Sequence, residues 1–293
     1  MRLLALILIF LAPAVLAAEF QGRQVEILDA RTSSQPAPLI LNLHGAGGTG
    51  PGHRRYSRFD AIAASYGVVV AYPSAPGPRW NDGRWDILRD PEKAARDDVG
   101  WFRALVAALV EQGLADPSRV YAIGHSNGGA MVRRLTCDAG DMLAGAAIVG
   151  TTLLTEFECR DDTPIATAFF MGTADQVIPF EGRPTGWESV IPMNIGKAHS
   201  APASAALLAA RNGCSGEAAT TVNPDASDGM SVIRHEFTGC AAPVVFYEIT
   251  GGGHVWPGAP AIPPGRMRTL LGGPVLDIDA GAEAMKLWLG APD

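Results

Sequence analysis

Short apolar runs alternate along the chain with segments in which apolar residues recur every three or four positions. The runs are rich in β-branched and aromatic residues and are apolar on both faces, which is typical of central strands in a mostly parallel sheet covered by helices on both sides. The predicted strands comprise residues 39–43, 68–72, 120–123, 146–149, 165–170 and 244–249.

The segments between these strands predict helices. Residues 99–110 place apolar side chains on one helical face, and Asp97 and Asp98 precede them as candidate capping residues. Similar periodicity predicts helices at 127–135, 203–211 and 280–289. Alternating strands and helices favour a doubly wound α/β fold. Two long stretches, 73–96 and 176–200, do not fit this alternation, and we expect them to be functional loops.

The first 17 residues predict a signal peptide. Arg2 precedes an apolar run over residues 3–16, and small residues at Ala17 and Ala18 provide a cleavage site. The run is shorter than the ~18 to 20 apolar residues that a membrane span needs. We therefore expect an exported protein, secreted or periplasmic, without membrane contact after cleavage. Residues 18–293 then form a single catalytic domain, and no polymer-binding module is expected.

Charge and cysteine content exclude some classes of partner. The formal net charge is −7 and the basic residues are dispersed, so a nucleic acid is not an expected partner. The four cysteines form an even set without a C-x-x-C pair, which favours two disulfides over a zinc site. Of the three possible connectivities, we predict Cys137–Cys159 and Cys214–Cys240, because each pair brackets adjacent elements.

A G-x-S-x-G motif provides a candidate nucleophile. Gly124, Ser126 and Gly128 lie where a predicted strand passes into a predicted helix. A sharp turn of this kind strains the backbone of the serine and leaves no room for side chains on close neighbours, which explains the glycines. The alternative is an ordinary glycine-rich turn with a capping serine. The interpretation as a nucleophile is supported by two further residues, His254 and Asp175.

A serine hydroxyl needs a base to take its proton and a carboxylate to orient that base. His254 lies five residues beyond the last predicted strand, in a glycine-rich loop that can reach back over the sheet edge. Asp175 follows the predicted strand at 165–170, where its carboxylate can accept a hydrogen bond from the imidazole. Chain order Ser, Asp, His is the order of the α/β-hydrolase fold. We therefore predict a Ser126–Asp175–His254 triad.

The glycine-rich segment at 43–48 is a candidate oxyanion loop. A tetrahedral intermediate needs two backbone N–H donors, which we assign to Asn127, directly after the serine, and to Ala46 in this loop. The segment also spells G-x-G-x-x-G, the pattern of a dinucleotide-binding fold. A dinucleotide-binding fold needs an acidic residue at the end of the next strand, and the sequence has none there. It also needs a helix directly after the loop, and we expect Pro51 to delay any helix.

Several motifs together resemble the polyhydroxybutyrate depolymerase-like esterases, sometimes grouped with feruloyl and acetylxylan esterases. The resemblance covers most of the mature chain, and it implies an α/β-hydrolase fold with the same triad and the same two N–H donors. A Cys-rich run of many relatives is replaced here by residues 82–90, so the pocket wall is expected to differ. The motifs are those at 43–48, 80–81, 97–100, 124–129, 172–175, 212–214 and 251–258.

Two tryptophans are candidate substrate-binding residues. Trp80 and Trp256 flank the predicted site in sequence and can form an apolar wall for an acyl or aryl group, whereas the alternative role for each is core packing. Such a wall suits acyl chains and phenolic rings equally.

The sequence thus predicts a secreted serine carboxylesterase that forms an acyl-enzyme on Ser126 and needs no metal or organic cofactor. The expected substrates are short-chain, hydroxyalkanoate-type or feruloyl-type esters, with soluble esters preferred to a polymer surface. Two alternatives stay open: an amide or peptide hydrolase on the same fold, and a non-catalytic binding protein that keeps the hydrolase fold.

Overall fold

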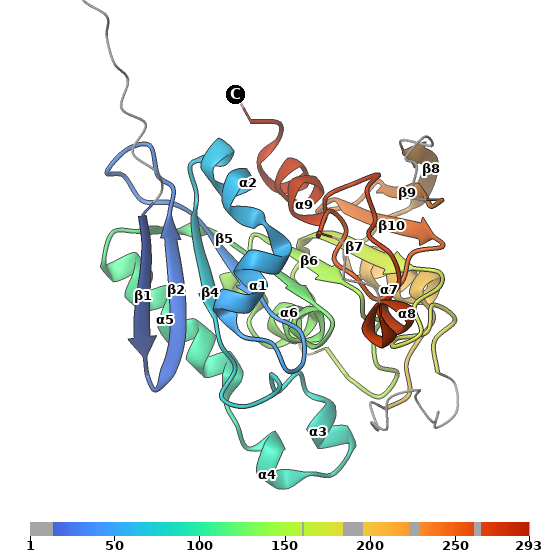
Figure 1. Ribbon diagram of the computed structural model, residues 1–293, viewed down its shortest axis with the longest axis horizontal. Helices are drawn as coiled ribbons and strands as arrows, with labels where there is room; N and C mark the ends of the chain where they lie inside the picture. The colour runs from blue at the N-terminus through green and yellow to red at the C-terminus, as the bar shows by residue number, and fades with distance from the viewer. Residues whose placement is uncertain (1–13, 160, 184–195, 223–228, 261–264, 293) are drawn as a thin grey trace, which may run out of the picture.

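A ten-stranded sheet runs through the computed structural model, which describes residues 14–159, 161–183, 196–222, 229–260 and 265–292 (Figure 1). The strands are β1 (Ala14–Phe20), β2 (Arg23–Asp29), β3 (Ala37–Leu43), β4 (Val69–Pro73), β5 (Ala115–His125), β6 (Gly145–Val149), β7 (Ala166–Gly172), β8 (Gly216–Val222), β9 (Ser231–Thr238) and β10 (Val244–Thr250). Their order across the sheet is β1-β2-β4-β3-β5-β6-β7-β10-β9-β8.

The centre of the sheet is parallel and its edges are antiparallel. Strands β4, β3, β5, β6, β7 and β10 pair in parallel, and they are the six strands that the sequence predicts. The antiparallel strands β1, β2, β8 and β9 extend the two edges and were not predicted. Strand β8 carries exposed side chains along almost its whole length, so it has no apolar pattern by which it could be recognised.

Helices cover both faces of the sheet, as predicted. Alternate residues of a strand point to opposite faces, so Leu39 and Leu41 pack on one side and Ile40 on the other. The first face is covered by α5 (Asp98–Glu111), α6 (Asn127–Asp138) and α7 (Ala201–Arg211). The second face is covered by α1 (Gly50–Ser57), α2 (Phe59–Tyr66) and α9 (Ala280–Leu289).

Helix α1 begins where the sequence analysis expected a delay. Pro51 lies in its first turn, where a proline costs no hydrogen bond because the first N–H groups of a helix have no partner inside it. The side chain of Thr49 caps the helix by accepting a hydrogen bond from the Gly52 N–H (3.2 Å). The expectation that Pro51 delays the helix is therefore wrong, and this helix carries two residues of the site described below.

The stretch 73–96 is an ordered excursion at one end of the sheet. It contains two short helices, α3 (Arg84–Ile87) and α4 (Pro91–Ala94), and Figure 1 shows both below the strands. Much of the second long stretch, residues 184–195 of the segment 176–200, lies outside the described residues. Helix α8 (Arg266–Leu271) follows the glycine-rich loop after β10 and, like α1 to α4, was not predicted.

Strand β1 overlaps the end of the predicted signal peptide. Residues 14–17 pair with β2 in the structure, and the side chains of residues 15–17 are exposed, with 66% of Leu16 accessible. Cleavage after residue 17 would leave residues 18–20 in this edge strand, and the leader stays a prediction. Within the described ranges, no helix is both long and apolar enough to cross a bilayer.

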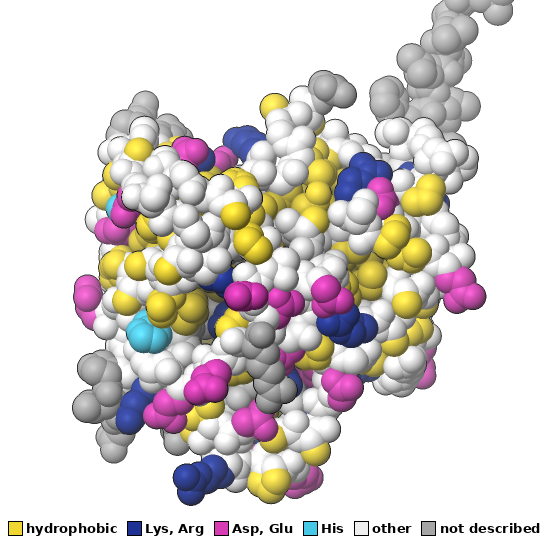
Figure 2. Space-filling model, turned by 180° about the vertical axis from the view of Figure 1, so that it is seen from behind, with side chains coloured by type: hydrophobic (Ala, Val, Ile, Leu, Met, Phe, Trp, Pro, Cys, Tyr) yellow, Lys and Arg dark blue, Asp and Glu magenta, His cyan; other side chains and the backbone are white. Residues whose placement is uncertain are grey.

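Acidic and basic side chains are interspersed on the face of the molecule seen from behind (Figure 2). Many charged side chains form local ion pairs, such as Arg103 with Asp141 (2.5 Å) and Arg134 with Asp138 (3.0 Å). Exposed pairs of this kind contribute little to stability, so the fold depends on its two buried faces.

Both predicted disulfides are present. Cys137 at the end of α6 bonds to Cys159, and Cys214 after α7 bonds to Cys240 after β9. Each bridge joins segments that are close in sequence, 22 and 26 residues apart, so it ties a loop to the helix or strand beside it.

We predict that replacing Cys214 and Cys240 together with serine lowers the free energy of unfolding by about 3 kcal/mol, because a loop of this size regains its freedom in the unfolded chain. Urea unfolding of the variant and the wild type, both free of reductant, measures the difference. An unchanged midpoint and slope would contradict the prediction. Non-reducing peptide mapping of the wild type checks the two pairings directly.

Candidate active site

Ser126 occupies the sharp turn between β5 and α6. Its backbone has φ 56° and ψ −119°, a conformation that costs of order 1–3 kcal/mol in a residue with a side chain. Two hydrogen bonds hold this turn: the Ser126 N–H donates to the Val149 carbonyl (2.7 Å), and the Ala130 N–H donates to the Ser126 carbonyl (2.9 Å). The serine hydroxyl is thereby raised above the carboxyl end of the sheet.

The glycines around the serine are required by close backbone contacts. A Cβ on Gly124 would lie 2.5 Å from the backbone of Gly128, and a Cβ on Gly128 would lie 2.4 Å from the Leu43 carbonyl oxygen. A Cβ on Gly45 would lie 3.3 Å from the Ser126 Cβ. The G-x-S-x-G pattern is therefore a packing requirement of this turn.

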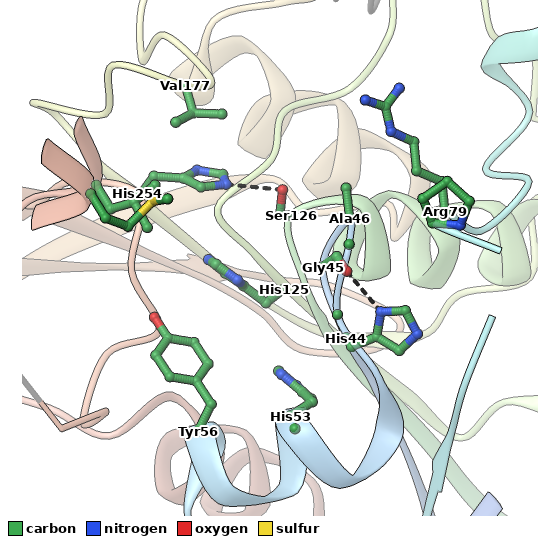
Figure 3. A pocket seen from close by; sticks show the side chains of 16 residues that line it. His44, Gly45, Ala46, His53, Tyr56, Arg79, His125, Ser126, Val177 and His254 are labelled. Atoms are coloured by element: carbon green, nitrogen blue, oxygen red, sulfur yellow. Dashed lines mark hydrogen bonds between the residues drawn. The ribbon is translucent and has the colours of Figure 1, made fainter. Parts of the chain in front are cut away.

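His254 connects Ser126 to Asp175. Ser126 Oγ lies 2.9 Å from His254 Nε2 (Figure 3), and His254 Nδ1 lies 2.7 Å from Asp175 Oδ2. The other oxygen of Asp175, Oδ1, accepts hydrogen bonds from the N–H groups of Val177 (2.8 Å) and Ile178 (2.7 Å), which fixes the carboxylate. The structure therefore brings the three predicted residues together from the ends of β5, β7 and β10.

The loop after β3 is held in place by the side chain of His44. Its Nδ1 bonds to the Gly45 carbonyl (2.7 Å), and its Nε2 accepts a hydrogen bond from the Ala75 N–H (3.0 Å). This pattern requires a neutral ring, and burial accordingly lowers the pKa of His44. The Gly47 N–H also donates to the Pro78 carbonyl (2.6 Å). The loop is thus anchored on both sides of Ala46.

Ala46, Ser126 and Asn127 line a small cavity of about 30 Å³. That volume suits a single water-sized group. Asn127 is the first residue of α6, and the first N–H groups of a helix have no acceptor within the helix. The two residues predicted as backbone donors, Ala46 and Asn127, therefore line one small cavity beside the serine.

The side chain of Asn127 has a separate role in packing. Its Oδ1 accepts a hydrogen bond from the Trp80 N–H (2.7 Å), and its Nδ2 donates to Asp82 Oδ2 (2.8 Å). Asp82 is fully buried and pairs with Arg84. Burial raises the pKa of the Asp82 carboxyl, but the guanidinium groups of Arg84 and Arg133 outweigh it and hold the pKa below its ordinary value.

The two predicted tryptophans do not form the substrate wall. Trp80 and Trp256 are both fully buried, and neither lines the cavity above Ser126. The Trp80 ring packs against His44 and Phe102, and Trp256 packs edge-on against His53 (5.2 Å between ring centres). The sequence interpretation is wrong because nearness to a catalytic motif does not reveal on which side of the backbone a large ring lies.

A cavity of about 610 Å³ lies above Ser126, with a size typical of small-molecule sites. One part of its wall is apolar, formed by Val177, Met267 and Leu271. Another part is polar, formed by His53 and Tyr56 of α1 and by His125, and Figure 3 shows this part below the serine. Sequence reasoning missed these lining residues. Helix α1 was not predicted, and His125 lies inside the G-x-S-x-G motif but was given no role.

The histidines of the polar wall are neutral. Burial, with a smaller effect of nearby His44, lowers the pKa of His53 to about 3. The pKa of His125 lies well below its ordinary value, mainly because the ring is buried and to a smaller extent because His254 and His53 are near. Within the described residues, no group of histidine, cysteine or carboxylate side chains has the geometry of a metal site.

Comparison with known proteins agrees with this geometry. The chain is 33% identical over 234 residues to NocK of Nocardia uniformis subsp. tsuyamanensis, which is named as an esterase; the match covers 75% of this chain and 66% of NocK. It is 28% identical to feruloyl esterase B of Piromyces equi, over 76% of this chain and 40% of that protein. The solved acetyl xylan esterase of Aspergillus awamori shares the fold, with a TM-score of 0.55 and 16% identity over 83% of this chain and 94% of its own.

The chain has an α/β-hydrolase fold, and the relatives that match most of its length are named as esterases. The model of the prolyl oligopeptidase family also matches residues 55–183 of this α/β-hydrolase, a segment that includes Ser126 and Asp175 but not His254. The chain spans 66% of the length of NocK and 40% of that of the Piromyces enzyme.

We predict that acid destabilises this hydrolase partly through His53. The unfolded chain takes up a proton at His53 near the ordinary pKa of 6.5, whereas the folded protein does so only near 3, so stability is full above about pH 6.5 and is lost as the pH falls. From pH 6.5 to 5 this amounts to about 2 kcal/mol.

Urea unfolding at pH 7.5 and pH 5 measures this effect. The variant His53→Gln keeps a donor for Asn42 but does not titrate, so it should lose about 2 kcal/mol less than the wild type over the same interval. An equal loss in both proteins would show that His53 is not protonated on unfolding in this range.

Proposed function

We propose that the chain is a serine carboxylesterase in which Ser126 is the nucleophile, His254 the general base and Asp175 the residue that orients and stabilises the base. The observation that carries this proposal is the continuous relay from Ser126 Oγ through the His254 ring to Asp175, with distances of 2.9 and 2.7 Å. A serine, a base and an orienting carboxylate in this geometry are the requirement for nucleophilic acyl transfer.

The reaction proceeds by two displacements. His254 Nε2 takes the proton of Ser126 Oγ as the oxygen attacks the ester carbonyl carbon, and the Ala46 and Asn127 N–H groups stabilise the negative oxygen that forms. His254 then gives the proton to the leaving alcohol, which departs and leaves an acyl-enzyme. Water, deprotonated by His254, attacks the acyl-enzyme and releases the acid and the free serine.

The proposed substrates are soluble esters of short acids, of hydroxyalkanoates or of feruloyl-type acids. Relatives named as a feruloyl esterase and as a poly(3-hydroxybutyrate) depolymerase support this range. The mixed wall of the cavity supports it too, because the apolar residues suit a small acyl or aryl group while the polar wall disfavours a long alkyl chain. We also propose that the protein is exported, since two disulfides are typical of oxidising compartments.

A peptidase is the second candidate, and one observation favours it: the matching family model is that of the prolyl oligopeptidases. The same triad chemistry cleaves amides when the leaving amine is protonated. The esterase names of the relatives that match over most of the chain favour the ester, and the substrate panel below includes an anilide to separate the two activities.

We predict that Ser126→Ala abolishes ester hydrolysis, with a loss of at least about a thousandfold in kcat, because the covalent step has no nucleophile. A fluorophosphonate probe should label the wild type once, at Ser126, and should not label the variant. The matched control is Ser65→Ala on the exposed side of α2, which should keep both activity and labelling. Turnover near the wild-type rate by a folded Ser126→Ala protein would refute the assignment.

We predict that kcat/KM is higher for p-nitrophenyl acetate and butyrate than for p-nitrophenyl decanoate, by about tenfold or more. The physical reason is that a ten-carbon chain extending along His53, Tyr56 and His125 would deprive these polar groups of hydrogen bonds. Initial rates on these esters, on methyl ferulate and on p-nitroanilides of the same acids measure the preference. A steady rise towards decanoate would contradict the short-ester proposal, and anilide rates equal to ester rates would favour the peptidase.

A further inference from the structure

We propose that His53, Tyr56 and His125, here called the polar arm of the cavity, bind an uncharged hydroxyl group of the substrate and so determine specificity for hydroxylated esters. This inference rests on the proposed esterase function and assigns a ligand to a part of the site that the triad does not use.

The three side chains form one continuous wall that leads to the base. Ring centres lie 6.3 Å apart for His53 and Tyr56, 5.9 Å for Tyr56 and His125, and 4.9 Å for His125 and His254. All four residues line the same cavity as Ser126 (Figure 3). A group that binds along this wall therefore lies within a few bonds of the ester carbonyl.

His53 offers an acceptor to the cavity. Its Nε2 lies 2.9 Å from Asn42 Oδ1, and Asn42 Nδ2 donates to Ser57 Oγ (3.5 Å), which keeps the amide oxygen turned towards the imidazole. Because an amide oxygen only accepts, the proton of the neutral ring is on Nε2. The nitrogen that remains for a ligand is Nδ1, which carries a lone pair.

Tyr56 offers a donor. Its hydroxyl oxygen already accepts a hydrogen bond from the Trp256 N–H (3.0 Å), so the hydroxyl proton is the part of the group that is left to bind a ligand. His125 lines the cavity beside Tyr56, but its Nε2 is enclosed by protein and has no hydrogen-bond partner among the described residues. This neutral ring therefore shapes the arm, and the hydrogen bonds to a ligand come from His53 and Tyr56. An acceptor and a donor on one wall match a hydroxyl group, which both donates and accepts.

The polar arm is unsuited to a charged group. The two histidines are neutral, and burial raises the pKa of Tyr56, so the arm carries no charge to pair with an ion. The charged residue among the lining side chains is Arg79, and Figure 3 shows it on the other side of Ser126. A buried ion without a partner pays a large desolvation penalty, whereas a hydroxyl group pays little once it is hydrogen-bonded.

The hydroxyl group can belong to the acid or to the alcohol of the ester, and two matched substrate pairs separate these sources. Ethyl 3-hydroxybutyrate and ethyl 3-methylbutyrate differ by a hydroxyl or a methyl on the acyl side. The esters 2-hydroxyethyl butyrate and propyl butyrate differ in the same way on the alcohol side. The measured quantity is the ratio of kcat/KM within each pair, which does not depend on the fraction of active enzyme.

In the wild type we expect a ratio of about tenfold or more in favour of the hydroxyl in one of the two pairs, because a site built for a hydroxyl leaves polar groups unpaired when a methyl takes its place. Tyr56→Phe should reduce that ratio about fivefold or more, since it removes the donor and keeps the ring. His53→Gln, which removes the Nδ1 acceptor and keeps a donor for Asn42, should also reduce it. The control Tyr66→Phe, at a hydroxyl bonded to the Gly290 carbonyl outside the cavity, should leave it unchanged.

A wild-type ratio near one in both pairs would overturn the inference, and so would a ratio that neither variant changes. If the four alkyl esters are inert while p-nitrophenyl acetate is hydrolysed, the inference fails and the esterase proposal stands. If no ester is hydrolysed and Ser126 takes no fluorophosphonate, the proposed function itself fails and the inference fails with it.

Discussion

The site depends on the strained backbone conformation of Ser126. This conformation is stabilised by contacts from several elements together. Its φ of 56° persists because the carbonyl of Val149 fixes the entering strand and the first turn of α6 fixes the departing helix. The helix can begin so close to strand β5 and to the end of β3 only because Gly124 and Gly128 have no Cβ. The packing of the sheet core thus stabilises a conformation that costs energy locally and places the hydroxyl at the sheet edge.

A single tryptophan links the two proposed oxyanion donors. Trp80 donates from its indole Nε1 to the His44 carbonyl (2.9 Å) and from its backbone N–H to Asn127 Oδ1 (2.7 Å). The loop that carries Ala46 and the helix that begins at Asn127 are therefore tied to the same buried ring, although they come from distant parts of the chain. Donors that are fixed before the reaction stabilise the developing charge without further reorganisation. The long stretch 73–96 therefore supports the site through the buried Trp80, while Pro78 and Arg79 of the same stretch line the cavity.

The site residues that follow the ends of strands could be predicted from the sequence. The residues whose role depends on which way they are buried could not. Ser126, Asp175 and His254 each come shortly after an apolar strand, and parallel strands bring such positions to one edge, so their meeting could be anticipated. The direction in which Trp256 points is set by packing against α1, a helix that the pattern did not reveal. Edge strand β8 has no buried face, so its residues lack the alternation that identifies a strand.

Four histidines line the cavity around Ser126, and their contacts explain why we propose one of them, His254, as the base. His44 uses both ring nitrogens to hold its loop, and His53 uses Nε2 to hold Asn42. His125 lies against the base itself, and a proton there would be buried beside a second imidazole without a carboxylate to balance it. Of the histidines that line the cavity, His254 has the carboxylate of Asp175 at 2.7 Å. In the proposed mechanism, the proton that leaves Ser126 is therefore stabilised at His254, and the other rings stay neutral beside the substrate.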